Sequence, residues 1–230
     1  MTEVAPLPFR PAAVIFDMDG LLLDSERAIL DSLRAAALDH RLDIDPDWWL
    51  CLIGHTDAVC RARLGRHIGE SPATALLDDG HARYVAIAEA GLPHRPGVVA
   101  LLELLVTHAM PRAVATSTRS PLAQRKLAAA GLLAYFDEVC TSSDVAQPKP
   151  APDVYLLAAE RLGVPPSQCL VLEDSPTGVR AALAAGMTAV QVPDLLAPDD
   201  EARALGHRIV GSLDEAQALI APWLSTATAG

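Results

Sequence analysis

The chain has 230 residues, a formal net charge of −11, 51 % hydrophobic residues and only 4 % aromatic residues. This length can bury a substantial core, and a composition dominated by Ala and Leu favours a helix-rich α/β protein over a sandwich or barrel. The acidic charge argues against nucleic acid and anionic membranes as partners, because both require a basic surface. No run of about 18 apolar residues occurs, so no membrane span is predicted.

The four cysteines lie in apolar surroundings and form no C-x-x-C pair. This pattern favours buried free thiols over zinc ligands or disulfides. The first ten residues carry two prolines and no long apolar stretch, so no signal peptide is predicted. We therefore expect a cytoplasmic protein, present as a monomer or a weak homodimer.

A short apolar run at 13–16, Ala-Val-Ile-Phe, predicts a buried strand, and Gly20 predicts a turn shortly after it. Asp17 and Asp19 thus stand at the carboxyl end of a strand, where open α/β sheets bind their ligands. Two carboxylates this close repel each other unless a cation or a shared proton relieves them. The pattern predicts a Mg²⁺ site with a nucleophilic carboxylate. A calcium-binding EF-hand loop is disfavoured, because apolar residues occupy the ligand positions that would follow.

Residues 25–91 carry helical patterns almost throughout and no convincing strand. At 45–46 (Asp-Pro) and at 71–72 (Ser-Pro), an N-cap residue precedes a proline in the first helical position, which predicts a helix start at each. The second of these helices is long and is expected to end before a glycine. This block reads as an all-α unit.

The pattern changes after residue 96 to short apolar strands that alternate with helices. Strands are predicted at 113–116, 138–141, 169–172, 188–192 and 209–210, and helices at 98–106, 121–131, 152–162, 176–185 and after 212. Such βαβ alternation predicts an α/β fold with a doubly wound parallel sheet. The helical block interrupts this sheet after its first strand. We therefore expect a Rossmann-like core from residues 1–24 and 92–230, with 25–91 inserted as an all-α helical cap domain.

Polar groups follow several of the predicted strands, and the carboxyl ends of parallel strands share one edge of a sheet. The segments, in chain order, are Asp-Met-Asp-Gly at 17–20, Val-Ala-Thr-Ser at 114–117, Gln-Pro-Lys-Pro-Ala-Pro-Asp at 147–153 and Val-Leu-Glu-Asp-Ser at 171–175. Taken in this order, they resemble the four motifs of the haloacid-dehalogenase superfamily of phosphotransferases. The resemblance covers residues 12 to about 220. The Asp-Ser-Glu at 24–26 and the loop near His55 look most like the β-phosphoglucomutase-like phosphatase branch, which has an α-helical C1 cap.

The resemblance implies that Asp17 is the nucleophile and forms an aspartyl-phosphate. Asp19 would act as general acid toward the leaving alcohol and then as general base for water. It also implies a Mg²⁺ ion held by the Asp17 carboxylate, the Asp19 backbone carbonyl and Asp174, with Glu173 contributing through water.

The same resemblance implies that Thr116 and Lys149 hold the transferring phosphoryl group. The backbone N–H groups of Met18 and Ser117 are further expected donors. Gly54 and His55, in a loop of the cap, are expected to touch the substrate. The cap itself is expected to close over a small phosphorylated metabolite and to exclude water.

We therefore expect a Mg²⁺-dependent phosphatase of small phosphorylated metabolites, sugar phosphates first. Dehalogenases of the family need neither the metal nor an acid at Asp19, and phosphonoacetaldehyde hydrolysis needs a cap lysine, which 25–91 lacks. Two alternatives stay open. One is a phosphomutase, although Ile29 and Asp57 stand where a mutase has a cap histidine and a phosphate-gripping arginine. The other is a non-catalytic protein that binds a phosphorylated ligand on the same fold.

Overall fold

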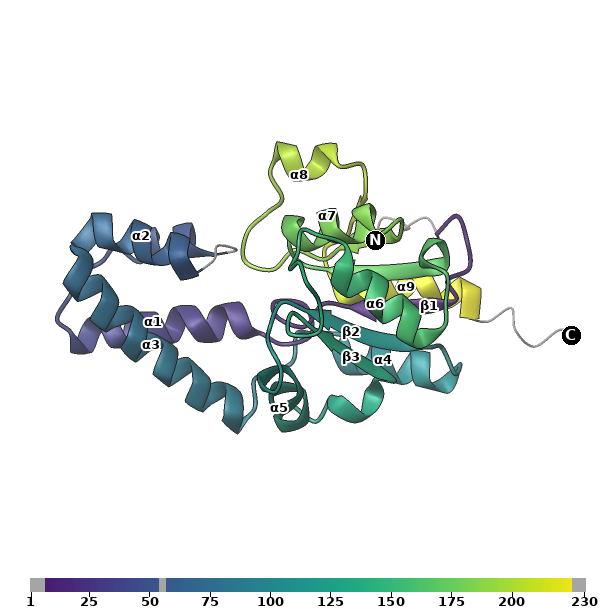
Figure 1. Ribbon diagram of the computed structural model, residues 1–230, viewed down its shortest axis with the longest axis horizontal. Coiled ribbons are helices and arrows are strands. Elements are labelled where there is room, and N and C mark those ends of the chain that lie inside the picture. Colours follow the sequence, from purple (N-terminus) through teal and green to yellow (C-terminus); the bar gives the residue numbers. More distant parts are fainter. Residues whose placement is uncertain (1–6, 54–56, 225–230) are drawn as a thin grey trace, which may run out of the picture.

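The computed structural model describes residues 7–53 and 57–224 (Figure 1). A parallel sheet with the order β3-β2-β1-β4-β5-β6 lies at its centre. Its strands are β1 (Ala13–Phe16), β2 (Arg112–Thr116), β3 (Glu138–Thr141), β4 (Cys169–Glu173), β5 (Thr188–Gln191) and β6 (Arg208–Ile209). This strand order is that of doubly wound α/β proteins, so the predicted fold class is confirmed.

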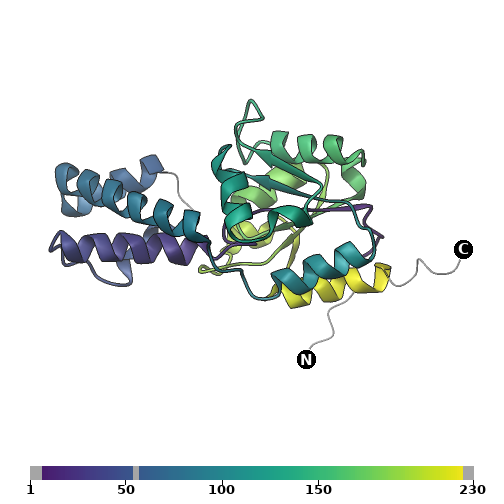
Figure 2. The ribbon, with the colours of Figure 1, turned by 90° about the horizontal axis from the view of Figure 1, so that it is seen from below.

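Helices cover both faces of the sheet. The helices of the core are α4 (Val98–Thr107), α5 (Leu122–Ala129), α6 (Asp153–Leu162), α7 (Pro176–Ala184), α8 (Asp200–Ala204) and α9 (Leu213–Leu224), with short 3₁₀ helices η2 (Leu133–Tyr135) and η3 (Pro166–Gln168). Alternate residues of β1 face opposite sides: Phe16 packs in the cluster beneath α4 and α9, whereas Ile15 packs in the cluster beneath α6 and α7. Figure 2 shows α4 and α9 side by side. Both faces of the central strand β1 are therefore buried and shielded from solvent.

Three α-helices that follow β1 and precede α4 project from the core (Figures 1 and 2). They are α1 (Ser25–Asp39), α2 (Asp57–Ile68) and α3 (Glu70–Ala90), joined by the 3₁₀ helix η1 (Trp48–Leu52). They enclose a hydrophobic cluster of their own that includes Leu33, Trp49 and Leu76. This arrangement is the helical cap that the sequence predicts.

Two short connections join the cap to the core and run side by side. The Asp24 N–H donates to the Pro93 carbonyl at 2.9 Å, and the Arg95 N–H donates to the Leu22 carbonyl at 3.0 Å. An antiparallel bridge links Leu23 to the same second connection. We place the domain boundaries of the core (1–24 and 92–230) and the cap (25–91) at these connections as a proposal.

The α-helix predicted to start at Asp45-Pro46 is wrong. At Asp45-Pro46 the chain forms a turn followed by the 3₁₀ helix η1 rather than an α-helix. The Asp45 carboxylate accepts the Asp47 N–H at 2.7 Å, which closes an Asx turn and competes with helix propagation. The start expected at 71–72 falls two residues earlier, with Gly69 as the N-cap and Glu70 as the first helical residue. Helix α8, whose first turn is capped by Asp199, was not predicted from the sequence.

All four cysteines are free thiols; Cys140 and Cys169 are buried as predicted, whereas the prediction of burial is wrong for Cys51 and Cys60, which are only partly buried. Within 7–53 and 57–224, none of the helices has both the length and the apolar character of a membrane span.

We predict that Trp49→Ala destabilises the cap selectively. Trp49 is 2 % exposed in the cap cluster, so its loss should cost about 3–5 kcal/mol in the free energy of unfolding of that unit. The matched control Leu50→Ala, at a side chain 37 % exposed, should change it by less than about 0.5 kcal/mol. Amide hydrogen exchange is the measurement: protection should fall in 25–90 and persist in the strands. A uniform loss over the whole chain would show that cap and core unfold as one unit.

Candidate active site

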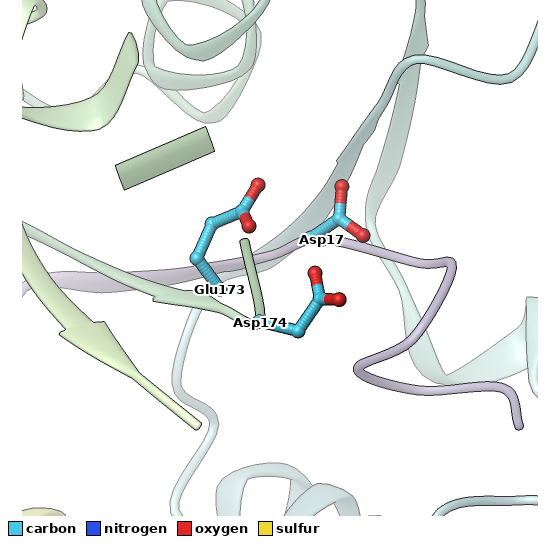
Figure 3. Close-up of side chains that lie close together, drawn as sticks. All are labelled: Asp17, Glu173 and Asp174. Carbon is cyan, nitrogen blue, oxygen red and sulfur yellow. The ribbon is translucent and has the colours of Figure 1, made fainter. Parts of the chain in front are cut away.

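Three carboxylates meet at the carboxyl edge of the sheet. Asp17 directly follows β1, Glu173 is the last residue of β4, and Asp174 comes next. One carboxylate oxygen from each residue lies within 4.8 Å of the other two, and Figure 3 shows the three side chains gathered around one point. The Asp17 N–H donates to the Leu172 carbonyl at 3.0 Å, which ties the first carboxylate to the neighbouring strand. The structure thus brings together three of the residues that the sequence singled out.

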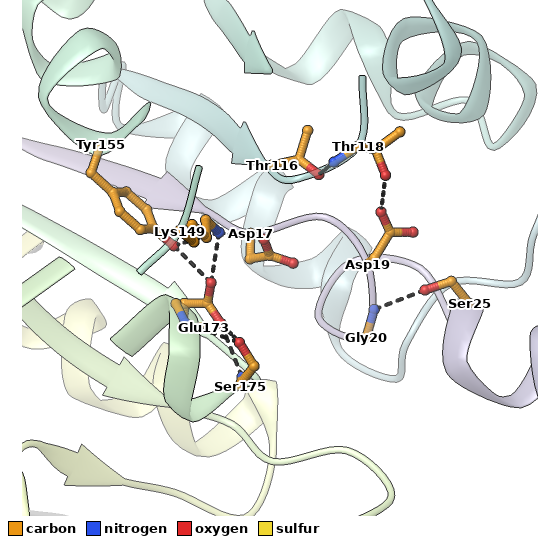
Figure 4. Close-up of polar contacts among 11 residues, drawn as sticks. Asp17, Asp19, Gly20, Ser25, Thr116, Thr118, Lys149, Tyr155, Glu173 and Ser175 are labelled. Carbon is orange, nitrogen blue, oxygen red and sulfur yellow. Dashed lines mark hydrogen bonds and ion pairs between the residues drawn. The ribbon is translucent and has the colours of Figure 1, made fainter. Parts of the chain in front are cut away.

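Lys149 lies among these carboxylates. Its Nζ donates to Asp17 Oδ1 at 2.6 Å and to Glu173 Oε1 at 2.7 Å, and only 4 % of its side chain is exposed. Lys149 Nζ also lies 2.9 Å from the Tyr155 hydroxyl, which in turn donates to Glu173 Oε1 at 2.8 Å (Figure 4). One ammonium therefore neutralises part of the charge of two carboxylates and bridges β1 to β4.

Protein donors occupy both oxygens of Glu173. Oε2 accepts the backbone N–H and the hydroxyl of Ser175, each at 2.9 Å, while Oε1 accepts from Lys149 and Tyr155. By contrast, none of the described residues donates a hydrogen bond to the Asp174 side chain. Both carboxylate oxygens of Glu173 are thus engaged in hydrogen bonds within the protein, whereas the oxygens of Asp174 are available to bind a ligand.

Burial and mutual repulsion set the ionisation of this cluster. Burial raises the pKa of Asp17 to about 7, although Lys149 opposes the shift. Burial also raises the pKa of Asp174 well above its ordinary value, and the nearby Glu173 and Asp17 charges add to the rise. For Glu173, Lys149 and the hydrogen bonds outweigh burial, so its pKa is lowered. Protons on Asp17 and Asp174 thus relieve the repulsion that Lys149 leaves, and a divalent metal ion, which prefers hard oxygen donors of this kind, could take their place.

Gly20 permits the close approach of Asp174. Its φ is +82°, a conformation that L side chains rarely adopt, and a Cβ at this position would overlap the Asp174 carboxylate. The Gly20 N–H donates to the Ser25 hydroxyl at 3.0 Å, which fixes the turn to the start of α1. The turn after β1 is thus shaped around the acidic cluster.

Asp19 lies on the other side of the same turn and has partners of its own. The Thr118 hydroxyl donates to Asp19 Oδ2 at 2.6 Å (Figure 4), and Lys126 forms an ion pair with Oδ1. The Asp19 side chain is 25 % exposed, whereas that of Lys126 is 2 % exposed. Lys126 Nζ also donates to the Tyr84 hydroxyl at 2.8 Å, so the Asp19 network reaches the cap.

The expected phosphate ligands lie at neighbouring strand ends. Thr116 ends β2 and is 1 % exposed, and its Oγ1 accepts the Thr118 N–H at 3.0 Å. Ser117 follows it and is exposed, while the Met18 side chain is fully buried. Gly54 and His55, the expected cap contacts, lie outside the described residues.

Several residues that hold the site together were not predicted from the sequence: Tyr84, Thr118, Lys126, Tyr155 and Gly178. The rarity of lysine in the sequence could have indicated one of them, Lys126. Of the 18 lysines and arginines, only two are lysines, Lys126 and Lys149, and both are buried against site carboxylates. Gly178 sits in the first turn of α7 against Glu173, where a Cβ would overlap the carboxylate.

A doubly wound parallel sheet whose central strands end in a buried acidic cluster, with a helical cap beside it, is an architecture of α/β enzymes. The sequence profile of the haloacid dehalogenase-like hydrolases matches residues 11–186, and the chain belongs to this family.

Known proteins of the family are similar over most of their length. Fructose-1-phosphate phosphatase YqaB of Escherichia coli is 38 % identical over 186 residues, which cover 80 % of this chain and 97 % of that protein. The crystal structure of a HAD family hydrolase from Deinococcus radiodurans, with bound phosphate and sodium, has a TM-score of 0.79 and 30 % identity, covering 92 % and 96 % of the two chains. A protein of Thermotoga maritima, provisionally named a β-phosphoglucomutase, has a TM-score of 0.73 and 28 % identity, covering 91 % and 97 %.

We predict that Gly178→Ala destabilises the protein, although alanine is the better helix former. The added methyl group must push Glu173 away from Lys149 and Tyr155, which should lower the free energy of unfolding by about 1–3 kcal/mol. Urea unfolding measures the change. The exposed neighbour provides the control, since Thr177→Ala should stay within about 0.5 kcal/mol of the parent. A Gly178→Ala protein as stable as the parent would contradict the close packing described.

Proposed function

We propose that the protein is a Mg²⁺-dependent phosphatase that hydrolyses phosphomonoesters of small metabolites, sugar phosphates first, through an aspartyl-phosphate on Asp17. The observation that carries this proposal is the arrangement of Lys149 and Asp174 around the Asp17 carboxylate. Family membership supports the reaction class, and the phosphate bound by the Deinococcus relative supports the ligand class.

Asp17 is suited to nucleophilic attack because only one of its oxygens is engaged. Lys149 holds Oδ1, and none of the described residues donates to Oδ2. In the first step that oxygen attacks phosphorus, the ester P–O bond breaks, and Asp19 gives its proton to the departing alkoxide. In the second step Asp19 takes a proton from water as the water attacks the phosphoryl group, and phosphate leaves while the Asp17 carboxylate is restored. Lys149 balances negative charge on the transferring group in both steps.

The metal ligands of this proposal are the Asp17 and Asp174 carboxylates and the Asp19 backbone carbonyl. When bound, Mg²⁺ neutralises charge on the phosphoryl oxygens and orients them toward Asp17. Glu173 already has four protein donors, so its role is to orient Lys149 and to reach the metal only through water.

The remaining phosphate contacts of the proposal come from Thr116, Lys149 and the backbone N–H groups of Met18 and Ser117. The name of the Escherichia coli relative, a fructose-1-phosphate phosphatase, supports a sugar phosphate as the substrate. We retain Gly54 and His55 as proposed substrate contacts of the cap.

The direct test is phosphate release from a panel of phosphorylated sugars. Wild-type protein should release phosphate only with Mg²⁺, and chelation should stop turnover. Asp17→Asn should fold normally and lose roughly four or more orders of magnitude in kcat, because the nucleophile is gone. The exposed Asp43→Asn is the matched control and should retain full activity. Substantial turnover by purified Asp17→Asn would rule out the nucleophile, and a wild type that binds phosphate esters without turning them over would favour the non-catalytic alternative.

A phosphomutase is the second candidate, because the Thermotoga maritima relative is provisionally named one. A mutase must hold a bisphosphate and shield its phosphoenzyme from water. Ile29 is an apolar, partly buried residue of α1, so it cannot exchange a proton as a cap histidine would. Asp57, at the start of α2, carries the wrong charge to hold a second phosphate.

We therefore predict that water is the acceptor of the phosphoryl group. With β-glucose 1-phosphate and a trace of its 1,6-bisphosphate, free phosphate should accumulate faster than glucose 6-phosphate. Both products are followed in one reaction by coupled assays. Faster formation of glucose 6-phosphate would replace the phosphatase proposal with the mutase.

A further inference from the structure

Lys126 connects three parts of the molecule that are distant in sequence. It belongs to α5 of the core, forms an ion pair with Asp19 in the turn after β1, and donates to the Tyr84 hydroxyl of cap helix α3 at 2.8 Å. Tyr84 is 8 % exposed, so this junction is closed to solvent on the cap side. With Thr118 on the second oxygen, Asp19 is held at both ends of its carboxylate.

We propose that Lys126 is a positioning residue for Asp19. It orients the carboxylate for proton exchange with the leaving group, and Tyr84 keeps Lys126 in place while the cap lies against the core. The inference rests on the proposed phosphatase function, in which Asp19 is the general acid and base.

Lys126 acts through Asp19 and not on the substrate. Its side chain is 2 % exposed, and its ammonium is engaged by Asp19 and Tyr84. An ammonium with these partners has no open path to a phosphate ester bound at Asp17. What it does control is where the Asp19 oxygens lie, because the ion pair and the Thr118 hydrogen bond together fix the carboxylate.

A purely structural role accounts poorly for this lysine. Placing an ammonium and a carboxylate out of water costs several kcal/mol per ion, and well-packed apolar residues often replace such a pair without loss of stability. Its neighbours Ala123 and Leu127 on the same helix are fully buried apolar residues, so an apolar side chain would suit the position.

The presence of a lysine rather than an arginine at position 126 also supports a positioning role. Sixteen of the 18 basic residues are arginines, and the two lysines pair with Asp17 and Asp19. A lysine places a compact point charge at the end of a flexible stem, whereas a guanidinium is a planar fork that needs more room. Each of the two lysines is therefore buried and ion-paired with one aspartate of the turn after β1, Lys126 with Asp19 and Lys149 with Asp17.

The test compares two esters of similar size, benzyl phosphate and p-nitrophenyl phosphate. Benzyl alkoxide needs a proton from Asp19 to leave, whereas p-nitrophenolate leaves almost unaided. We measure kcat/KM with Mg²⁺, because it reports the steps up to phosphoryl transfer to Asp17 and not the later attack of water.

Lys126→Met should lower kcat/KM for benzyl phosphate by about 100-fold or more, and for p-nitrophenyl phosphate by less than about fivefold. Tyr84→Phe should shift the ratio in the same direction by about tenfold, since it removes one hydrogen bond to Lys126. Arg125→Met is the control on the same helix: its ion pair with Glu89 of α3 is exposed, so the ratio should stay unchanged.

The ratio of the two kcat/KM values does not depend on the folded fraction, so a partly misfolded variant still gives a result. An equal loss on both esters, or no loss, would overturn the positioning role and leave the phosphatase intact. A wild type that hydrolyses neither ester in Mg²⁺ would instead reject the proposed function, and this inference with it.

Discussion

Charge balance among buried carboxylates is the constraint on which the rest of this structure depends. Asp17, Glu173 and Asp174 converge because the ends of β1 and β4 are paired in register, and burial removes the water that would otherwise screen them. Lys149 offsets part of that charge, and removing one partner from such a buried pair typically costs about 3–5 kcal/mol. The fold tolerates the remaining imbalance at the point where a metal ion and a phosphate ester are proposed to bind.

The surroundings of the cluster are shaped to its oxygens. Gly20 and Gly178 have no side chain where a carboxylate approaches the backbone, and Ser175 both accepts the Gly178 N–H and donates to Glu173. The Gln191 side chain donates to the Asp174 carbonyl at 2.8 Å, so β5 also supports the cluster. Elements that look like ordinary turns and caps thus position the carboxylates.

The sequence predicted the fold well because its signals are local. Buried strands appear as apolar runs, helices end at glycine, and the βαβ alternation leaves few topologies open. The 3₁₀ helix after Asp45 was not predicted, since an Asx turn and an N-cap use the same residues and differ only in the hydrogen bond that forms. The same distinction applies to the site. Asp17 and Asp174 could be predicted from their places directly after strands, and Lys149 only from the resemblance of its loop to a family motif; the structure brings the three together.

The partners of those residues could not be predicted in this manner. Lys126 and Tyr84 lie on two helices 42 positions apart, and nothing in the local pattern of either helix indicates that they meet at Asp19. The four donors of Glu173 likewise come from three different segments. Such contacts are set by how helices pack, and only residue usage across the whole chain, with its two lysines, pointed toward them.

The placement of those lysines has a consequence for the chemistry of the molecular surface. All other basic side chains are guanidinium or imidazole groups, so the chain offers no lysine amine outside its site. Reagents and enzymes that modify lysine side chains meet only two targets, each nearly inaccessible and ion-paired with a carboxylate. In the folded state this protein is therefore shielded from lysine chemistry, and labelling of either lysine would report that the site has opened.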